Sequence, residues 1–293
     1  MTRRAKIRTS VYALAFVAYV VLFWVVGLAD SLILYPSHQP VETYGARREW
    51  LDTPAGRIEA FAMPSRAALE AGGPRAIVLE TIPNAGRAEY AWAGAEEWAD
   101  WPVEFVAINY PGYGDTPGAA TLKGVHRSAL AAYDALAARY PGKPIFVSGM
   151  SLGTAAALHV AARRPVAGLV LQNPVPLRQL ILGRFGWWNL WLAAGPVALG
   201  VPPELDALAN AARVRAPAVF LTAEDDTLVP PAYQRRVIAA YAGAKREVTF
   251  PGGHNETPAG DAAEKASAAR AWLWERHFGA GDSTGNRESD AHR

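Results

Sequence analysis

The chain has 293 residues, no cysteine and a formal net charge of +2. This length suits one large α/β domain or two small ones. The lack of cysteine excludes disulfides, Cys-ligated metal sites and a thiol nucleophile. The near-neutral charge, without a long basic stripe, gives no reason to expect a nucleic-acid partner.

The N-terminal region predicts a membrane anchor. A basic start, residues 1–10, precedes the uncharged apolar run 11–29. As one helix this run could cross the roughly 30 Å hydrocarbon core of a bilayer. The basic residues before it and Asp30 after it predict a single-pass protein of the cell membrane, with the N-terminus cytoplasmic and the rest outside. A cleaved signal peptide is the alternative, although its apolar core is usually shorter.

The rest of the chain predicts one α/β domain. A connector, 30–47, leads into the domain at 48–278, and a hairpin opens it at 48–64. Apolar strands then alternate with helices, which is typical of a parallel sheet covered on both faces. The strands are expected at 76–82, 103–110, 145–147, 166–172, 218–222 and 247–250, and the helices at 87–101, 122–140, 231–243 and 262–278. The polar residues 279–293 predict a disordered tail.

A candidate nucleophile lies between a strand and a helix. Ser151 stands between Gly149 and Gly153, after the strand at 145–147. A sharp strand-to-helix turn strains the serine backbone and needs small residues two positions away on either side. This arrangement is the nucleophile elbow of α/β-hydrolases. It would leave the Leu152 N–H at a helix N-terminus, where it can stabilise an oxyanion.

Residues 174–215 interrupt the alternation and predict a helical cap insertion over the carboxyl ends of the strands. Three tryptophans lie in it: Trp187, Trp188 and Trp191. They could fill the core, line an apolar substrate pocket or touch a membrane surface, where tryptophan is common. The sequence leaves these three interpretations open.

A serine nucleophile needs a base, and the base needs an acid to orient it. In α/β-hydrolases these follow the serine in the order acid, then histidine. Glu224, Asp225 and Asp226 follow one buried strand, and His254 lies in a Gly-rich loop before the last helix. Each of the three acids is a candidate. No HExxH motif or cluster with metal-ligand spacing occurs, so neither a metal nor another cofactor is expected.

Several motifs together resemble single-pass membrane-anchored α/β-hydrolases. They are ILYPS, PNAG, NYPGYGDTPG, GMSLG, AEDDTLVP and PGGHNE, in that order. This group is similar to ABHD-type proteins and to relatives of prolyl oligopeptidases. The resemblance implies an eight-stranded, mostly parallel sheet, and its G-x-x-D-x-x-V-P pattern assigns the acid to Asp226. It also implies a second oxyanion donor after the strand at 76–82. Proline has no N–H, so Asn84 beside Pro83 is expected to supply it.

These observations predict a serine hydrolase that cleaves a carboxylic ester or thioester through Ser151, His254 and Asp226. Its partners would be a small-molecule or acyl substrate and the lipid bilayer. A peptidase or amidase with the same triad is the alternative. A catalytically silent binding module on the same scaffold is a third reading, motivated by the altered loop around Pro83.

Overall fold

The computed structural model describes residues 3–24, 27–189 and 191–279. Its centre is one eight-stranded sheet with the order β1-β2-β4-β3-β5-β6-β7-β8. β1 (Arg47–Thr53) and β2 (Gly56–Pro64) form the expected antiparallel hairpin, and β2 also pairs antiparallel with β4. The remaining pairs are parallel. The prediction of a mostly parallel eight-stranded sheet is therefore confirmed.

The parallel strands are mostly apolar, as expected for strands that are buried on both faces, except the last one, which lies at the edge of the sheet and exposes Arg246, Glu247 and Thr249. The parallel strands are β3 (Ala76–Thr81), β4 (Val103–Ile108), β5 (Ile145–Met150), β6 (Gly168–Gln172), β7 (Ala218–Ala223) and β8 (Lys245–Phe250). The helices of the domain are α3 (Arg66–Glu70), α4 (Ala91–Glu97), α5 (Leu122–Arg139), α6 (Leu152–Ala161), α10 (Pro231–Ala240) and α11 (Asp261–Phe278). A 3-10 turn, Ala88–Tyr90, begins the helical stretch expected at 87–101.

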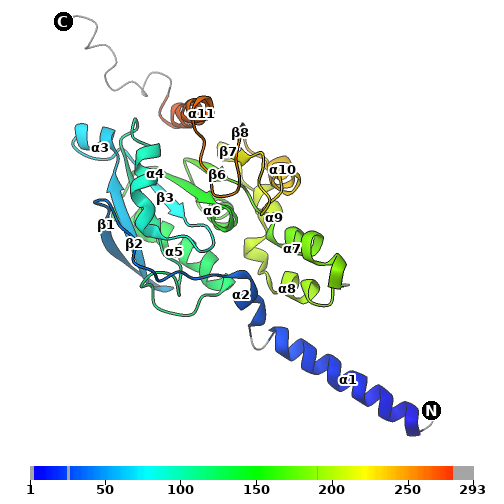
Figure 1. Cartoon of the computed structure of the whole chain (residues 1–293). Helices are drawn as coiled ribbons and strands as arrows, with labels where there is room; N and C mark the ends of the chain where they lie inside the picture. Colours follow the sequence, from blue (N-terminus) through cyan, green and yellow to red (C-terminus); the bar gives the residue numbers. More distant parts are fainter. Residues whose placement is uncertain (1–2, 25–26, 190, 280–293) are drawn as a thin grey trace, which may run out of the picture.

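Helices cover both faces of the sheet (Figure 1). On one face, the Phe146 ring lies 5.5 Å from the Trp98 ring at the end of α4 and 5.9 Å from the Trp274 ring of α11. On the other face, α6 packs against β3, where the Thr81 hydroxyl donates a hydrogen bond to the Gly153 carbonyl in the first turn of α6. The two faces differ, because a cavity lies between α4 and the sheet on the first of them.

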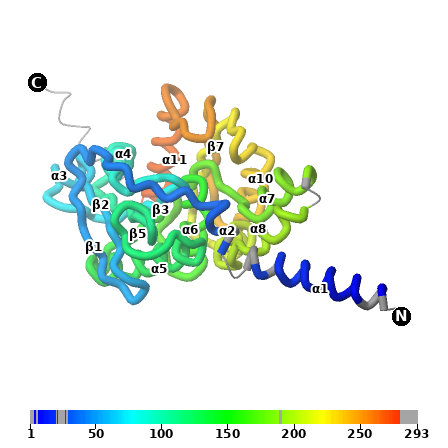
Figure 2. Tube along the Cα trace, turned by 60° about the horizontal axis from the view of Figure 1, so that its bottom comes forward, coloured from blue at the N-terminus to red at the C-terminus, as the bar shows by residue number. Residues whose placement is uncertain are grey.

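The N-terminal region differs from the prediction of one helix over 11–29. Helix α1 begins earlier, at Arg3, and ends at Trp24. Gly27 adopts a left-handed conformation (φ 68°) and begins the separate helix α2, Leu28–Ile33. Among the described residues, no helix is both long enough and apolar enough to cross a membrane. α1 extends away from the domain, while α2 lies beside it (Figure 2).

The region between β6 and β7 is helical. It contains α7 (Leu177–Phe185), the 3-10 turn Trp187–Asn189, α8 (Ala194–Gly200), a second 3-10 turn (Pro203–Leu205) and α9 (Ala207–Ala211). The side chains of Trp187, Trp188 and Trp191 are 69%, 63% and 51% exposed. The interpretation that they fill the core is wrong, because all three lie between α7 and α8 with more than half of their surface exposed. The predicted tail lies almost wholly outside the described residues.

Candidate active site

Ser151 occupies a strained turn between β5 and α6. Its backbone has φ 52° and ψ −119°, a conformation that a side chain rarely adopts. Close packing holds the turn in place, since a Cβ on Gly153 would lie 1.9 Å from the Thr81 carbonyl oxygen and one on Gly149 would lie 2.7 Å from Gly153 O. Both glycines are therefore required by the approach of β3 to the first turn of α6.

The structure joins Asp226 to His254 and leaves the other two acids in solvent. Asp226 is 2% exposed, and its Oδ2 lies 2.7 Å from His254 Nδ1. Glu224 and Asp225 are exposed. Burial therefore selects among the three candidates, and the selected residue is the one that the sequence pattern assigned.

Asp226 is surrounded by donors. Its Oδ1 accepts from the backbone N–H groups of Leu228 (2.9 Å) and Val229 (2.7 Å). Its Oδ2 accepts from Gln234 Nε2 at 3.0 Å as well as facing His254. Three N–H donors suit the acceptor-only form of a carboxylate. In the tautomer with the proton on Nδ1, His254 donates to the same carboxylate and leaves Nε2 free to accept a proton.

The Ser151 hydroxyl makes no hydrogen bond to the His254 ring in the described part of the chain. Catalytic hydrogen bonds are often long in a free enzyme and shorten when substrate binds. Ser151 is 6% exposed and lies at the carboxyl end of β5, and Asp226 and His254 lie in the loops that follow β7 and β8. All three therefore come from the same edge of the sheet.

Two residues that the sequence analysis did not identify hold the loops of Asp226 and His254 in place. Asn173, at φ 49°, accepts from Ala223 N–H and donates to the His254 carbonyl. Gln234 holds Asp226 from α10. Asn173 directly follows a buried strand and precedes Pro174, and a polar residue at that point was the available signal.

The loop after β3 contains the proposed second oxyanion donor. It lies against the first turn of α6, because a Cβ on Gly153 would also lie 2.9 Å from the Ile82 carbonyl oxygen. The Asn84 side chain binds the connector: its Nδ2 donates to Ile33 O (2.6 Å) and its Oδ1 accepts from Tyr35 N–H (2.9 Å). The Tyr113 hydroxyl donates to the same Oδ1 at 2.9 Å. The connector therefore braces this loop, a link that no sequence pattern indicated.

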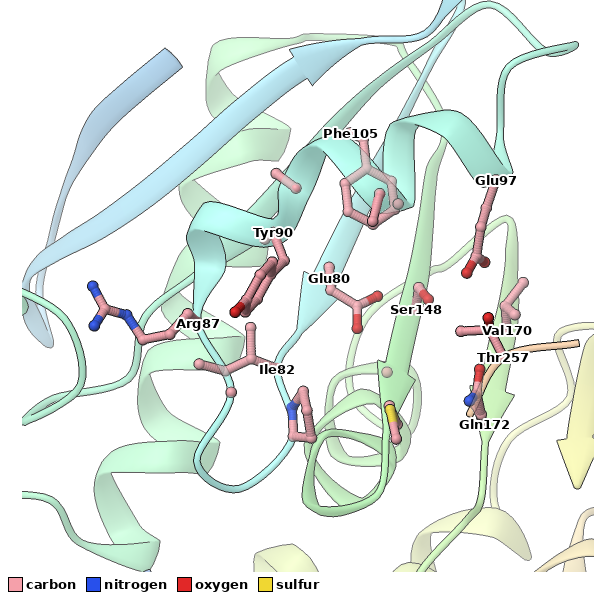
Figure 3. A pocket seen from close by; sticks show the side chains of 18 of the residues that line it. Glu80, Ile82, Arg87, Tyr90, Glu97, Phe105, Ser148, Val170, Gln172 and Thr257 are labelled. Atoms are coloured by element: carbon pink, nitrogen blue, oxygen red, sulfur yellow. The ribbon is translucent and has the colours of Figure 1, made fainter. Parts of the chain in front are cut away.

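A cavity of about 640 Å³ opens beside these loops (Figure 3). Its lining includes Asn84 of the β3 loop, Met150 before Ser151 and Asn255 after His254. Its interior lies between α4 and the sheet, where Glu80, Glu97 and Ser148 line it. Trp187, Trp188 and Trp191 do not line this cavity, so it gives the predicted pocket beneath the cap no support.

Among the described residues, no group of three or more His, Asp or Glu side chains could hold a metal ion. The chemistry available at this edge is that of a serine hydroxyl beside a histidine–aspartate pair.

The model for the family described as serine aminopeptidase, S33, matches residues 85–195. The chain is 30% identical over 287 residues to the "Uncharacterized protein Rv2307c" of Mycobacterium tuberculosis, covering 93% of this chain and 97% of that protein. It is 27% identical to lysophosphatidylserine lipase ABHD12 of Macaca fascicularis over 154 residues, 48% of this chain and 38% of the lipase. The esterase Pf2001 of Pyrococcus furiosus has the same fold, with a TM-score of 0.62 at 14% identity over 84% of this chain and 98% of the esterase.

Proposed function

This chain belongs to the α/β-hydrolase superfamily, in the same family as Rv2307c, and is a serine hydrolase by fold; from that premise we propose that it cleaves a carboxylic ester or thioester through Ser151, His254 and Asp226. The observation that carries the proposal is the 2.7 Å contact between His254 Nδ1 and the buried Asp226 carboxylate. A buried acid in contact with a histidine is the pair that a serine nucleophile requires.

In the proposed mechanism, Ser151 attacks the acyl carbon while His254 Nε2 accepts the serine proton. Asp226 fixes the His254 tautomer and stabilises the imidazolium that forms. The Leu152 N–H at the start of α6, together with the Asn84 N–H, would bind the oxyanion. His254 then donates its proton to the leaving alcohol or thiol. Water attacks the acyl-enzyme in the second half, with His254 again acting as the base.

The test combines turnover with active-site labelling. Wild type should hydrolyse short p-nitrophenyl esters and react with a fluorophosphonate probe. Ser151→Ala should lose several orders of magnitude in kcat and all labelling. Equal labelling of wild type and Ser151→Ala would show that the nucleophile is another residue. A folded wild type that hydrolyses no ester would instead favour the binding module.

A peptidase or amidase is the second candidate, and the match of residues 85–195 to the serine aminopeptidase family favours it. The same triad serves both reactions, but amide cleavage must protonate a poorer leaving group. Aminoacyl p-nitroanilides compared with p-nitrophenyl esters of the same acyl groups separate the two. Faster turnover of the anilides would replace the esterase proposal.

We also propose that the N-terminal segment holds the enzyme at the cell membrane, with its basic end toward the cytoplasm. Large apolar side chains of α1 are strongly exposed, among them Val11, Leu14 and Phe16 at 59%, 77% and 66%. Exposed Arg4 and Arg8 precede them and would face anionic headgroups. Fractionation of the full chain tests this: recovery in the soluble fraction, unchanged by Leu14→Glu with Phe16→Glu, would refute it.

A further inference from the structure

The cavity between α4 and the sheet contains an acid that the proposed triad does not use. Glu80 of β3 and Ser148 of β5 are paired neighbours in the sheet, and both line the cavity. Figure 3 shows the Glu80 carboxylate directed toward Ser148 and Glu97. An acid placed inside a sheet needs a reason, because a buried carboxylate without a cation is strongly unfavourable.

Glu80 is half-buried because it faces the cavity, and it has no salt-bridge partner within 4 Å among the described residues, whereas the buried acids Glu104, Glu89 and Asp226 each have one. Two charged groups on the packed helices act on Glu80: Glu97 of α4 raises its pKa and Arg270 of α11 lowers it. Arg87 also lines the cavity, and it is paired with Glu89. Arg270 is already bound to Glu97 by an ion pair. Burial, opposed by the hydrogen bond with Ser148, raises the pKa of Glu80 to about 8. The cavity therefore holds an acid whose charge has no dedicated counter-ion.

The remaining walls suit the apolar part of a ligand. Phe105, Ile82 and Val170 line the space around the acid, together with the ring of Tyr90, which is 50% exposed (Figure 3). Gly94 of α4 allows the Phe105 ring to lie against the helix, since a Cβ there would be 2.1 Å from the ring. Aromatic faces also attract cations. An alkyl chain that ends in an ammonium group matches both the walls and Glu80.

The distance from the nucleophile sets where that ammonium must be. Ser148, the neighbour of Glu80, precedes Ser151 by three residues on the same strand end. At about 3.3 Å per residue, the acid lies roughly 10 Å from the reacting centre. An α-amino group beside the scissile carbonyl could not reach it. A terminal amine on a chain of several methylenes could.

We propose that this cavity binds the substrate and that Glu80 is the counter-ion for a terminal ammonium group on its acyl or alcohol chain. This inference rests on the proposed esterase function and names its substrate class. The lining residues Asn84, Met150 and Asn255 bring the cavity next to the reaction centre, because Met150 precedes Ser151, Asn255 follows His254 and Asn84 is the proposed oxyanion donor. Binding of the cation would favour the ionised form of Glu80 and release its proton to solvent.

The test uses two matched ester pairs on the full chain. In the acyl pair, p-nitrophenyl 6-aminohexanoate is compared with p-nitrophenyl heptanoate, which replaces the ammonium with a methyl group. In the alcohol pair, 6-aminohexyl acetate is compared with heptyl acetate. Wild type should prefer the amine in one pair by about tenfold or more in kcat/KM. The pair that shows the preference identifies the side of the ester that enters the cavity.

Glu80→Gln should remove the preference while keeping turnover of the methyl analogue. Glu104→Gln is the matched control, because Glu104 is a buried acid of the neighbouring strand that pairs with Arg47 and does not line the cavity. The wild-type preference should rise as pH increases through about 8, because Glu80 ionises there, and this rise should vanish in Glu80→Gln. The preference is the ratio of the kcat/KM values for the two substrates, so the pH dependence that both share through the triad cancels.

Normal hydrolysis of heptanoate or heptyl acetate without any amine preference in wild type would overturn the cavity assignment and leave the esterase function standing. A preference that survives in Glu80→Gln would equally overturn it. Loss of all ester hydrolysis in wild type would refute the proposed function itself. If Glu80→Gln fails to fold, inhibition of wild type by hexylammonium but not by hexanol decides the matter, and equal inhibition by both overturns the proposal.

Discussion

Replacing the Asn84 side chain should impair catalysis even though its backbone N–H, the proposed oxyanion donor, remains. The side chain makes hydrogen bonds of 2.6 Å to Ile33 O, 2.9 Å from Tyr35 N–H and 2.9 Å from the Tyr113 hydroxyl. Asn84→Ala removes these three bonds to other segments and also the 3.1 Å bond that Oδ1 accepts from Ala85 N–H within the loop. The variant therefore separates the position of the loop from the identity of the donor.

The magnitude follows from the three bonds. Each contributes about 1 kcal/mol net, so together they hold the loop by about 3 kcal/mol at most. Water replaces part of the bond to exposed Tyr35, which lowers the loss to about 1.5–3 kcal/mol. This corresponds to a fall of about 10- to 100-fold in the fraction of molecules with the donor in place. We expect kcat/KM on p-nitrophenyl acetate to fall by a similar factor.

Two further variants sharpen the assay. Tyr113→Phe removes one bond and leaves the connector attached, so its loss should be about fivefold or less. Asn84→Asp keeps the acceptor but loses the donor to Ile33 O, and its effect should lie between the other two. Thermal unfolding is measured on each protein to verify folding. If folded Asn84→Ala keeps wild-type kcat/KM within twofold, the side chain does not position the oxyanion loop.

Three other outcomes follow from the site and the core. Asp226→Asn should lower kcat about 10⁴-fold, because an amide cannot accept from every donor around residue 226 and His254 is no longer held in the required tautomer. Stopped assays with p-nitrophenyl esters measure kcat, and activity above a tenth of wild type would contradict this expectation. Gly153→Ala should give little folded protein by thermal unfolding, since its Cβ would lie 1.9 Å from Thr81 O; a wild-type Tm would refute the packing argument. Burial lowers the pKa of His159 from 6.5 to about 4. As pH falls, the unfolded state therefore binds the His159 proton before the folded state does. The stability that the neutral, buried His159 contributes is complete above pH 6.5 and is lost as pH falls toward 4. Urea unfolding should show a shallower loss between pH 6.5 and 4 in a folded His159→Gln variant, and an unchanged slope would show that other groups dominate.

The strand–turn–helix around Ser151 could be predicted because its requirements are local. A strained serine needs small neighbours, and a buried parallel strand needs an apolar run, so both leave a mark in a few consecutive residues. The alternation of strands and helices predicted the sheet for the same reason. The turn residues of the hairpin at β1 and β2 were equally local.

The tertiary structure decided what depends on contacts between distant segments. Burial of Asp226, with Glu224 and Asp225 in solvent, separated three acids that residue type alone leaves equivalent. The exposure of Trp187, Trp188 and Trp191 depends on how the cap packs, and large aromatic residues look the same in a core and on a surface. The boundary between α1 and α2 depends on the left-handed Gly27, which interrupts an apolar run without any change in hydropathy.

The sequence by itself therefore determined the fold and the turn that presents Ser151, because short-range sterics and apolar periodicity impose them. The structure alone revealed the connector that braces Asn84 and the cavity around Glu80. The Asn84 contacts join residues about fifty positions apart, and the cavity is enclosed by α4, β3, β5 and the loop after β8. Such arrangements arise from the packing of whole elements, and no single stretch of sequence contains them.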